Sequence, residues 1–117
     1  MSHFLESELR PWGRFDVLLD EKYCKVKQII VRSGQRLSYQ KHFKREELWT
    51  VVSGELTVVI DGFESVHQVG DSIHIPKESL HRMINRTNDD VIVIEIQRGD
   101  YFGEDDIVRI EDDYSRI

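Results

Sequence analysis

Four polar side chains from two stretches of the chain have the types and the spacing of a metal site. Gln40 and His42 lie two residues apart, so on a β-strand they point to the same face. Glu47 follows after a short basic connection, and His81 lies in a second stretch of alternating residues. One amide oxygen, two imidazoles and one carboxylate suit Zn²⁺, Fe²⁺, Mn²⁺ or Co²⁺. If the four meet in one cavity, they form a divalent-metal site that leaves coordination positions open to a substrate.

The neighbours of Glu47 indicate that this face points into the protein. Glu47, Trp49 and Val51 alternate along one expected strand, and two of the three are large and apolar. A carboxylate among apolar side chains is costly unless a cation or a hydrogen bond satisfies it. Taken one at a time, Gln40, His42 and Glu47 are ordinary surface residues of a strand. Their joint spacing is what favours the site.

The elements that would position these residues are short strands separated by turn signals. We expect strands at residues 23–31, 48–52, 56–60, 65–69, 72–75, 81–85 and 91–97. Asp61-Gly62 is a strong hairpin signal, because both central positions of a two-residue turn favour positive φ. Strands at this spacing are typical of an antiparallel sandwich or barrel, so the predicted fold class is all-β.

The two ends of the chain have a less regular pattern. Residues 6–13 are expected to form a helical turn or coil. Residues 101–114 form an acidic segment with a few aliphatic anchors, which we expect as a strand or short helix packed on the outside of the barrel. No stretch shows the period of a long amphipathic helix.

Composition and charge narrow the class of protein. The chain of 117 residues is expected to be one domain, residues 1–117, and its 39% apolar and 32% charged residues are typical of a globular protein. A net charge of −6 argues against general nucleic-acid binding. The longest apolar run, residues 91–94, is too short to span a membrane, and the start of the chain lacks the order of a signal peptide. With a single cysteine, Cys24, the chain is expected to be cytoplasmic.

Basic residues cluster locally although the whole chain is acidic. Arg36, Lys41, Lys44 and Arg45 fall within ten residues of one another. Such a cluster either attracts a small anion or forms a solvated strand edge, whose lysines discourage pairing with other sheets. Charge alone leaves both interpretations open.

Two segments resemble the two motifs of the cupin superfamily. The first motif (glycine, His-x-His, glutamate, glycine) is met by Gly34, Gln40 in place of the first histidine, His42, Glu47 and Gly54. The second motif (glycine, proline, glycine, histidine, asparagine) is met by Gly70, Pro76, Glu78 in place of the second glycine, His81 and Asn85. The resemblance implies a double-stranded β-helix, the cupin or jelly-roll barrel, with one metal ion held by Gln40, His42, Glu47 and His81.

A narrower resemblance covers nearly the whole chain, from Arg10 to Arg116. The sequences RPWG at residues 10–13, S-x-Q-x-H with R-x-E-x-W at residues 38–49, and the tail GDYFGEDDIVRIEDDYSR resemble the cupin domain of type II phosphomannose isomerases. In that family this domain follows a mannose-1-phosphate guanylyltransferase domain, for which 117 residues leave no room. The resemblance implies isomerisation of mannose 6-phosphate and fructose 6-phosphate. The implied cofactor is a divalent metal, Zn²⁺ first, with Co²⁺, Mn²⁺, Fe²⁺ and Ni²⁺ as alternatives.

The implied reaction needs a cation that holds the phosphate of the sugar phosphate. Arginine binds phosphate with two parallel hydrogen bonds, so Arg45 is the first candidate. Arg36, Lys44 and Arg82 come next, and Trp49 is expected to contact the substrate. This assignment also accounts for the local basic cluster.

The reaction also needs a base that moves a carbon-bound proton. Glu95 lies in the apolar stretch VIVIEIQ, whose neighbours would raise its pKa toward neutrality. The alternative is a sheet glutamate that faces solvent. Glu78 and the acidic run at residues 104–106 are further candidates for the base.

Two other functions compete with the isomerase. One is a metal-containing cupin that binds a sugar phosphate without catalysis. The other is a different small-cupin activity, such as a metal-dependent dioxygenase, against which Gln40 argues because an amide oxygen is a weaker donor than imidazole. The resemblance to cupins also implies a homodimer, which would cover the sheet edges of so small a barrel.

Overall fold

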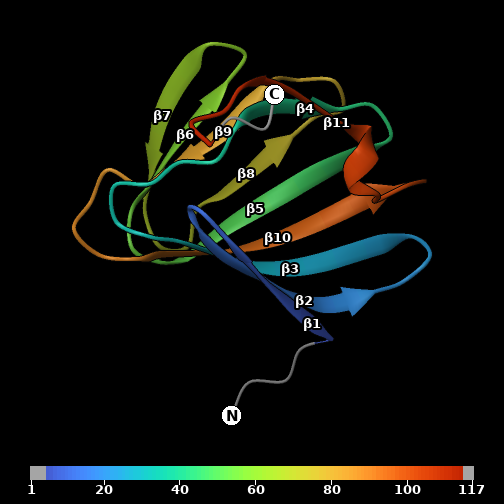
Figure 1. The fold of residues 1–117 in the computed structure, drawn as a ribbon, viewed down its shortest axis with the longest axis horizontal. Coiled ribbons are helices and arrows are strands. Elements are labelled where there is room, and N and C mark those ends of the chain that lie inside the picture. Colours follow the sequence, from blue (N-terminus) through green and yellow to red (C-terminus); the bar gives the residue numbers. More distant parts are fainter. Residues whose placement is uncertain (1–4, 115–117) are drawn as a thin grey trace.

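The computed structural model describes residues 5–114, which form almost only β-strands (Figure 1). The elements are β1 (Glu6–Arg10), β2 (Gly13–Asp20), β3 (Cys24–Val31), β4 (Tyr39–His42), β5 (Arg45–Ser53), β6 (Leu56–Ile60), β7 (Phe63–His67), β8 (Ser72–Ile75), β9 (His81–Ile84), β10 (Val91–Gly99), the short 3₁₀ helix η1 (Glu104–Asp106) and β11 (Ile107–Glu111). The all-β prediction is confirmed. No helix within the described residues is long and apolar enough to span a bilayer.

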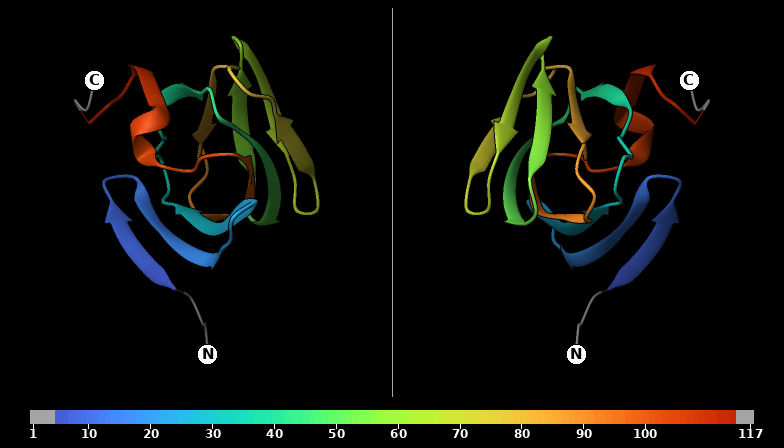
Figure 2. Two further views of the ribbon diagram at one scale, coloured as in Figure 1. Left: turned by 90° about the vertical axis from the view of Figure 1, so that its right-hand side faces the viewer. Right: turned by 90° about the vertical axis from the view of Figure 1, so that its left-hand side faces the viewer.

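The strands form two antiparallel sheets. The large sheet has the order β1-β2-β3-β10-β5-β8, and the small sheet has the order β11-β4-β9-β6-β7. The sheets curve toward each other around a common interior (Figure 2). From β3 to β5, and again from β7 to β11, the chain changes sheet at every strand. Residues that are close in sequence therefore reach the interior from opposite walls.

Most of the expected strands are confirmed. β6 and β8 match residues 56–60 and 72–75, and β3, β9 and β10 differ from the prediction by only one or two residues at one end. β5 begins at Arg45, earlier than expected, so that Glu47 lies within the strand. Asp61 and Gly62 join β6 to β7 with φ values of 48° and 86°, which confirms the predicted hairpin turn.

The prediction of a helical turn or coil at residues 6–13 is wrong, because most of this segment is strand β1. β1 pairs with β2 at the edge of the large sheet. Its side chains are largely exposed, and Leu9 is 74% exposed, so the segment lacks the alternating pattern of a half-buried strand. At Gly13, which begins β2, a Cβ would lie only 2.0 Å from the carbonyl oxygen of Ile30. This close approach of β2 to β3 requires glycine.

The C-terminal segment contains both of the elements that were expected as alternatives. η1 is followed directly by β11, which pairs with β4 and forms one edge of the small sheet. The segment does not only pack on the outside, because Glu104, Ile107 and Arg109 line the interior cavity. It is thus part of the barrel wall.

The core between the sheets is apolar over much of its length. Val31, Val51, Leu56, Val58, Val91 and Val93 are all fully buried, with 0% of their surface exposed. Along β10 the inward positions change from apolar to polar, in the series Val91, Val93, Glu95 and Gln97, and along the antiparallel β5 they change from polar to apolar. The polar side chains therefore gather at one end of the interior.

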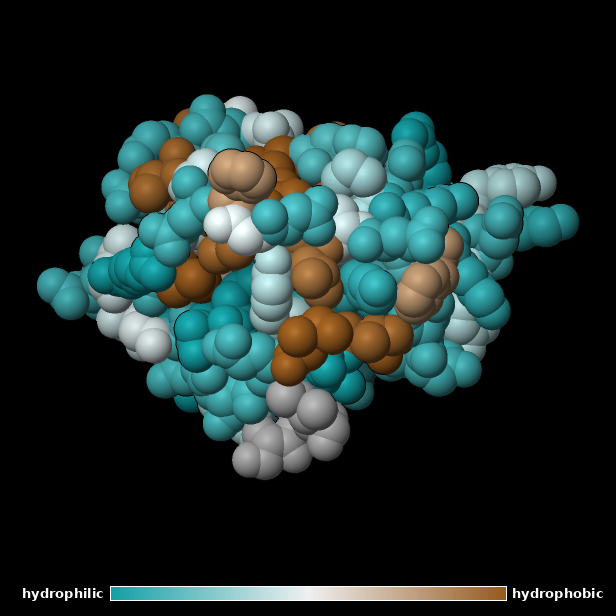
Figure 3. Space-filling model, turned by 90° about the horizontal axis from the view of Figure 1, so that it is seen from above, coloured by the Kyte–Doolittle hydropathy of each residue, from teal (hydrophilic) through white to brown (hydrophobic). Residues whose placement is uncertain are grey.

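The outer surface is mixed. The face seen in Figure 3 is mostly hydrophilic, with hydrophobic residues grouped near its middle. On the outer side of the large sheet, Leu48, Val52 and Ile96 are between 38% and 44% exposed. Exposed apolar residues of this kind are common on monomers and do not define an interface. The homodimer stays a prediction, which sedimentation at micromolar concentration checks.

Candidate metal centre

A cavity opens at the polar end of the interior, between the two sheets. Its walls include Lys27, Arg45, Glu47, Trp49, Glu95 and Gln97 from the large sheet and Gln40, His81, Arg82 and Met83 from the small sheet. Alternation along each strand explains the gathering, since Arg45, Glu47 and Trp49 are spaced two residues apart on β5 and point to the same side. The cavity thus receives polar side chains from both walls.

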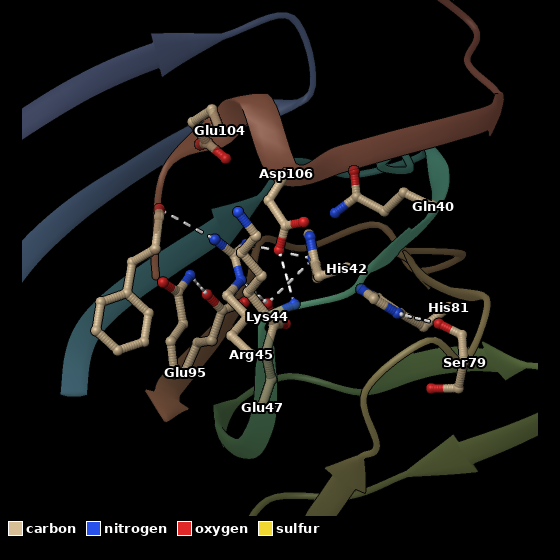
Figure 4. A network of polar contacts seen from close by, with 12 residues as sticks. Gln40, His42, Lys44, Arg45, Glu47, Ser79, His81, Glu95, Glu104 and Asp106 are labelled. Atoms are coloured by element: carbon tan, nitrogen blue, oxygen red, sulfur yellow. Dashed lines mark hydrogen bonds and ion pairs between the residues drawn. The ribbon is translucent and has the colours of Figure 1, made fainter. Parts of the chain in front are cut away.

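Three of the four predicted ligands form a buried cluster (Figure 4). The candidate ligand atoms of His42, Glu47 and His81 all lie within 4.8 Å of one another. The three side chains are 2%, 3% and 2% exposed. They come from the end of β4, the first part of β5 and the start of β9, so both sheets contribute. A carboxylate and two imidazoles in such a cluster form a candidate metal site.

His81 presents an unused nitrogen at this site. Its Nδ1 donates to the carbonyl oxygen of Ser79 at 3.0 Å, which leaves Nε2 as the lone-pair nitrogen of a neutral ring. Nε2 is buried and has no hydrogen-bond partner within residues 5–114. Burial, as the main cause, lowers the pKa of His81. The neutral imidazole with one nitrogen fixed by a carbonyl is the form that binds metals.

The contact between His42 and Glu47 also fits a cation. His42 Nε2 lies 3.2 Å from Glu47 Oε2 and 3.2 Å from Arg45 Nη2. A guanidinium only donates, so the contact with Arg45 requires a lone pair on Nε2, whereas the contact with Glu47 requires a proton there. The other ring nitrogen, Nδ1, is buried and has no hydrogen-bond partner within the described residues, so it offers a lone pair to a cation when Nε2 donates to Glu47. The residues present therefore fit a metal ion.

Glu47 is held in its ionised form by its neighbours. Arg45 Nε donates to Oε2 at 3.0 Å, and Trp49 Nε1 donates to Oε1 at 2.9 Å. Burial would raise the pKa of Glu47, but the hydrogen bond with His42 and the charge of Arg45 outweigh it and hold the pKa well below its ordinary value. The carboxylate form is the one that a metal ion requires.

Gln40, the fourth predicted ligand, lies beside the cluster. It lines the cavity, and the register of the small sheet places it opposite His81. Its Oε1 accepts a hydrogen bond from Ser38 Oγ at 2.6 Å. Its role as a ligand stays a prediction.

Arg45, the first candidate for the phosphate, is buried within the cluster and is 3% exposed. Besides Glu47 and His42, it contacts the carbonyl oxygen of Phe102, to which Nη1 donates at 3.2 Å. These contacts connect the C-terminal segment to the candidate metal site. Binding of phosphate by Arg45 stays a prediction.

Glu95, the first candidate for the base, lies in the cavity wall and not on the solvent side of the sheet. It is 5% exposed, and Gln97 Nε2 donates to its Oε1 at 2.5 Å. Burial first, and then the negative charge of Glu47, raises the pKa of Glu95 to about 8. A carboxyl group with a pKa near neutrality suits proton transfer.

Of the other predicted substrate contacts, two line the cavity and two lie outside its wall. Trp49 and Arg82 line the cavity, and Arg82 Nε donates to the carbonyl oxygen of Leu37 at 2.7 Å. Arg36 is not part of this wall, and its Nε pairs with Asp113 at 2.7 Å. Lys44 also lies outside the wall, with its Nζ 4.9 Å from the centre of the Tyr101 ring.

The remaining candidates for the base have structural contacts. Glu78 is exposed and has a φ of 65°, the left-handed conformation that a glycine at this motif position would adopt. Its backbone N–H donates to the carbonyl oxygen of His42 at 2.7 Å, which supports the end of β4. Glu104 lines the cavity and lies 3.6 Å from Lys27. Asp106 accepts a hydrogen bond from the backbone N–H of Lys44 at 3.0 Å.

Sequence reasoning missed several polar residues of the cavity wall, among them Lys27, Gln97 and Arg109. A signal for each was present in the alternation of its strand. Lys27 alternates with Ile29, and Gln97 alternates with Glu95. Arg109 alternates with Ile107 in the tail segment. Without the register of the sheets, the pattern alone does not say which alternate set faces inward.

The fold is that of a double-stranded β-helix. A protein from Klebsiella pneumoniae, described as an uncharacterized conserved protein with a double-stranded beta-helix domain, superposes with a TM-score of 0.73 over 82% of each chain at 21% identity. A Cupin 2 conserved barrel domain protein from Salinispora arenicola superposes with a TM-score of 0.66 over 73% of this chain and 74% of that chain, at 20% identity. At such identities the likeness shows the fold alone, and it confirms the predicted cupin barrel.

The chain belongs to the family described as Mannose-6-phosphate isomerase C-terminal, whose model matches residues 2–112. It is 43% identical over 107 residues to the alginate biosynthesis protein AlgA of Pseudomonas aeruginosa. This alignment covers 92% of this chain and 22% of AlgA. It is 38% identical over 116 residues to the mannose-1-phosphate guanylyltransferase ManC of Salmonella typhimurium. This alignment covers 98% of this chain and 24% of ManC. The predicted resemblance is confirmed, and the chain spans less than a quarter of the length of these two relatives.

Proposed function

We propose that this domain interconverts mannose 6-phosphate and fructose 6-phosphate in a metal-dependent reaction. The observation that carries the proposal is the cavity that Glu47, His81 and Glu95 line together. It joins a candidate metal site to a carboxyl group whose pKa is raised to about 8. A metal-assisted aldose–ketose isomerisation uses both, and the family description supports the choice of sugar phosphate.

His42, Glu47 and His81 are the residues that would hold the metal, with Gln40 beside them as the proposed fourth ligand. Zn²⁺ is the first choice, because this set of nitrogen and oxygen donors suits it. When bound, a divalent cation supplies the positive charge that stabilises negative charge developing on the sugar oxygens.

Glu95 acts as the base in this proposal. It takes the proton from C2 of mannose 6-phosphate and returns it to C1, while the hydroxyl proton of O2 passes to O1, which gives fructose 6-phosphate. Gln97 orients the carboxyl group through its hydrogen bond of 2.5 Å. Arg45 and Trp49 position Glu47 by donating to its two oxygens, so that the carboxylate cannot turn away from the cavity.

A coupled assay of fructose 6-phosphate formation tests the proposal. The chain is stripped of metal with a chelator and then loaded with Zn²⁺, Co²⁺, Mn²⁺, Fe²⁺ or Ni²⁺ in turn. We expect turnover of mannose 6-phosphate only after metal is restored. Absence of turnover with all five metals would eliminate the isomerase.

Two variants separate the base from the metal site. Glu95→Gln should keep its metal content and lose about 10²- to 10⁴-fold in kcat, the contribution typical of a general base. His74→Gln is the matched control, because His74 is 54% exposed and lies outside the cavity wall. It should leave both quantities unchanged.

A second candidate is a metal-containing domain that binds the sugar phosphate without turning it over. The observation in its favour is that this chain matches only 22% and 24% of two relatives, whose activities belong to much longer proteins. Thermal stabilisation by mannose 6-phosphate without turnover would support this candidate. Turnover by the isolated chain would eliminate it.

A further inference from the structure

Arg109 of β11 is a cation in the cavity wall that has no carboxylate partner within residues 5–114. Its Nε atom is buried and makes no hydrogen bond to the described part of the protein. A guanidinium nitrogen that is removed from water without an acceptor is destabilising. An anionic ligand in the cavity would supply the missing acceptor.

The other cations of the cavity wall are already paired with carboxylates. The pairs are Arg45 with Glu47 at 3.0 Å, Arg82 with Glu111 at 3.0 Å, Arg10 with Glu8 at 3.3 Å and Lys27 with Glu104 at 3.6 Å. An anion that enters the cavity would have to compete with a fixed carboxylate at each of these positions. Arg109 is the cavity-lining cation of the described residues that offers its charge without such competition.

The register of the small sheet connects Arg109 to the candidate ligands. Arg109 lies opposite Gln40, and Gln40 lies opposite His81. Residues directly opposite one another on paired strands point to the same face of a sheet. The three side chains therefore form one row across the cavity wall, with two strand spacings of about 4.8 Å between the backbones of Arg109 and His81. A ligand that is bound at His81 and extends along this row reaches Arg109.

We propose that Arg109 binds the phosphate group of the substrate and so selects phosphorylated sugars. This inference rests on the proposed function, because it places the reacting carbons of the sugar phosphate at the His42, Glu47 and His81 cluster. The planar guanidinium offers paired N–H groups that match two phosphate oxygens. Ile107, two residues earlier on β11, also lines the cavity, so this edge strand forms the phosphate end of the site.

Calorimetric titration and steady-state kinetics on the zinc-loaded full chain test the inference. Mannose 6-phosphate and unphosphorylated mannose are the two probes. In Arg109→Gln, we expect the Kd and KM for mannose 6-phosphate to rise roughly 10- to 100-fold, the effect of losing hydrogen bonds to a charged group. The kcat and zinc content should change far less. Arg109→Lys should fall between the two proteins, because lysine keeps the charge but not the paired donors.

Arg86→Gln is the matched control, because Arg86 is an exposed arginine that pairs with Glu64 outside the cavity. It should bind mannose 6-phosphate as the parent protein does. Melting curves establish that each variant is folded, and Arg109→Lys carries the test if Arg109→Gln does not fold.

The outcomes separate this inference from the proposed function. If the parent turns over mannose 6-phosphate and both Arg109 variants keep its Kd and KM, the role of Arg109 is overturned while the isomerase stands. If the parent binds without turnover and Arg109→Gln abolishes the binding, the role of Arg109 stands while the isomerase falls. If the parent prefers mannose to mannose 6-phosphate or binds neither, both are overturned.

Discussion

The two ends of the barrel interior are built from the same strands but have opposite chemistry. At one end the register of the large sheet aligns Val91 with Val31, and Val93 with both Ile29 and Val51. Further along β10, Glu95 lies opposite Lys27 and Trp49, and Gln97 lies opposite Glu47. A single strand thus supplies the apolar core and, a few residues later, the wall of the cavity.

Residues that stabilise the fold and residues suited to chemistry thus occupy different lengths of the same strands. The apolar end consists of fully buried aliphatic side chains that need no partners. The polar end holds four buried atoms that lack a hydrogen-bond partner within the described residues: His42 Nδ1, His81 Nε2, Gln97 Oε1 and Arg109 Nε. Native cores normally satisfy such atoms, so their gathering at one end marks a place shaped for a ligand.

The largest effect is expected when the polar end loses its carboxylate. Glu47→Ala should abolish metal binding. It should also reduce turnover at least about 100-fold, because the positive charge of the metal ion that stabilises the transition state is lost. It should also lower the free energy of unfolding by about 3–5 kcal/mol, because Arg45 is left buried without its partner. Elemental analysis, the coupled assay and urea denaturation measure the three effects.

Glu46→Ala is the control for this substitution. Glu46 is the next residue on β5, and it lies outside the cavity wall, where it pairs with Arg98. Its metal content and turnover should equal those of the parent. A Glu47→Ala protein that still binds one equivalent of metal would contradict the assignment of the metal site to the polar end.

The next effect is expected at the apolar end and concerns stability alone. Leu56 is fully buried at the start of β6, whereas Ile60 at the other end of this strand lies opposite His81. Leu56→Ala should lower the free energy of unfolding by about 2–5 kcal/mol through the loss of buried contacts and the cavity left behind. The metal content and KM of the folded protein should not change.

Val66→Ala, at a site that is 54% exposed on β7, should leave the unfolding free energy nearly unchanged. Urea denaturation and metal titration of both variants check the separation of the two ends. Weaker metal binding by folded Leu56→Ala would show that the ends are coupled.

A smaller, pH-dependent effect is expected from Glu95 in the metal-free protein. Its pKa is about 8 in the folded state against an ordinary value of 4.5, so ionisation favours the unfolded state. Stability relative to Glu95→Gln should therefore be highest below pH 4.5 and should fall as the pH rises toward 8, by an amount on the order of a few kcal/mol. Urea denaturation of both proteins from pH 5 to 8.5 measures the difference. A difference that does not change with pH would contradict the raised pKa.

The smallest effect is expected at the rim of the polar end. Lys27 Nζ lies 3.6 Å from Glu104 Oε1, and the Glu104 side chain is 49% exposed. Glu104→Gln should change the free energy of unfolding by only about 1 kcal/mol, because water screens the half-exposed carboxylate and Lys27, itself 6% exposed, keeps its Nζ over the Phe15 ring at 4.2 Å. Denaturation at low and high salt provides the measurement. A loss as large as that in Glu47→Ala would mean that the C-terminal segment is as essential to stability as the buried cluster.

The candidate site was predictable where its residues lie close in sequence or carry a motif. Gln40, His42 and Glu47 were identified from their spacing, and His81 from the second motif. Arg45 also shares the alternation of Glu47, yet the pattern could not show that its guanidinium pairs with that carboxylate and not with a ligand. Strand β1 was missed because its exposed side chains carry no alternating apolar signal.

Local features could be predicted from the sequence alone: most of the strands, the Asp61-Gly62 turn, the ligand types and their spacing. These features depend on short-range backbone preferences and on alternation. Which alternate set of side chains faces inward, and which residues it contacts there, depends on how the sheets assemble. The row from Arg109 through Gln40 to His81 depends on the pairing of three strands that are distant in the chain. Register sets the face of every side chain in a strand, and register is a property of the assembled sheet.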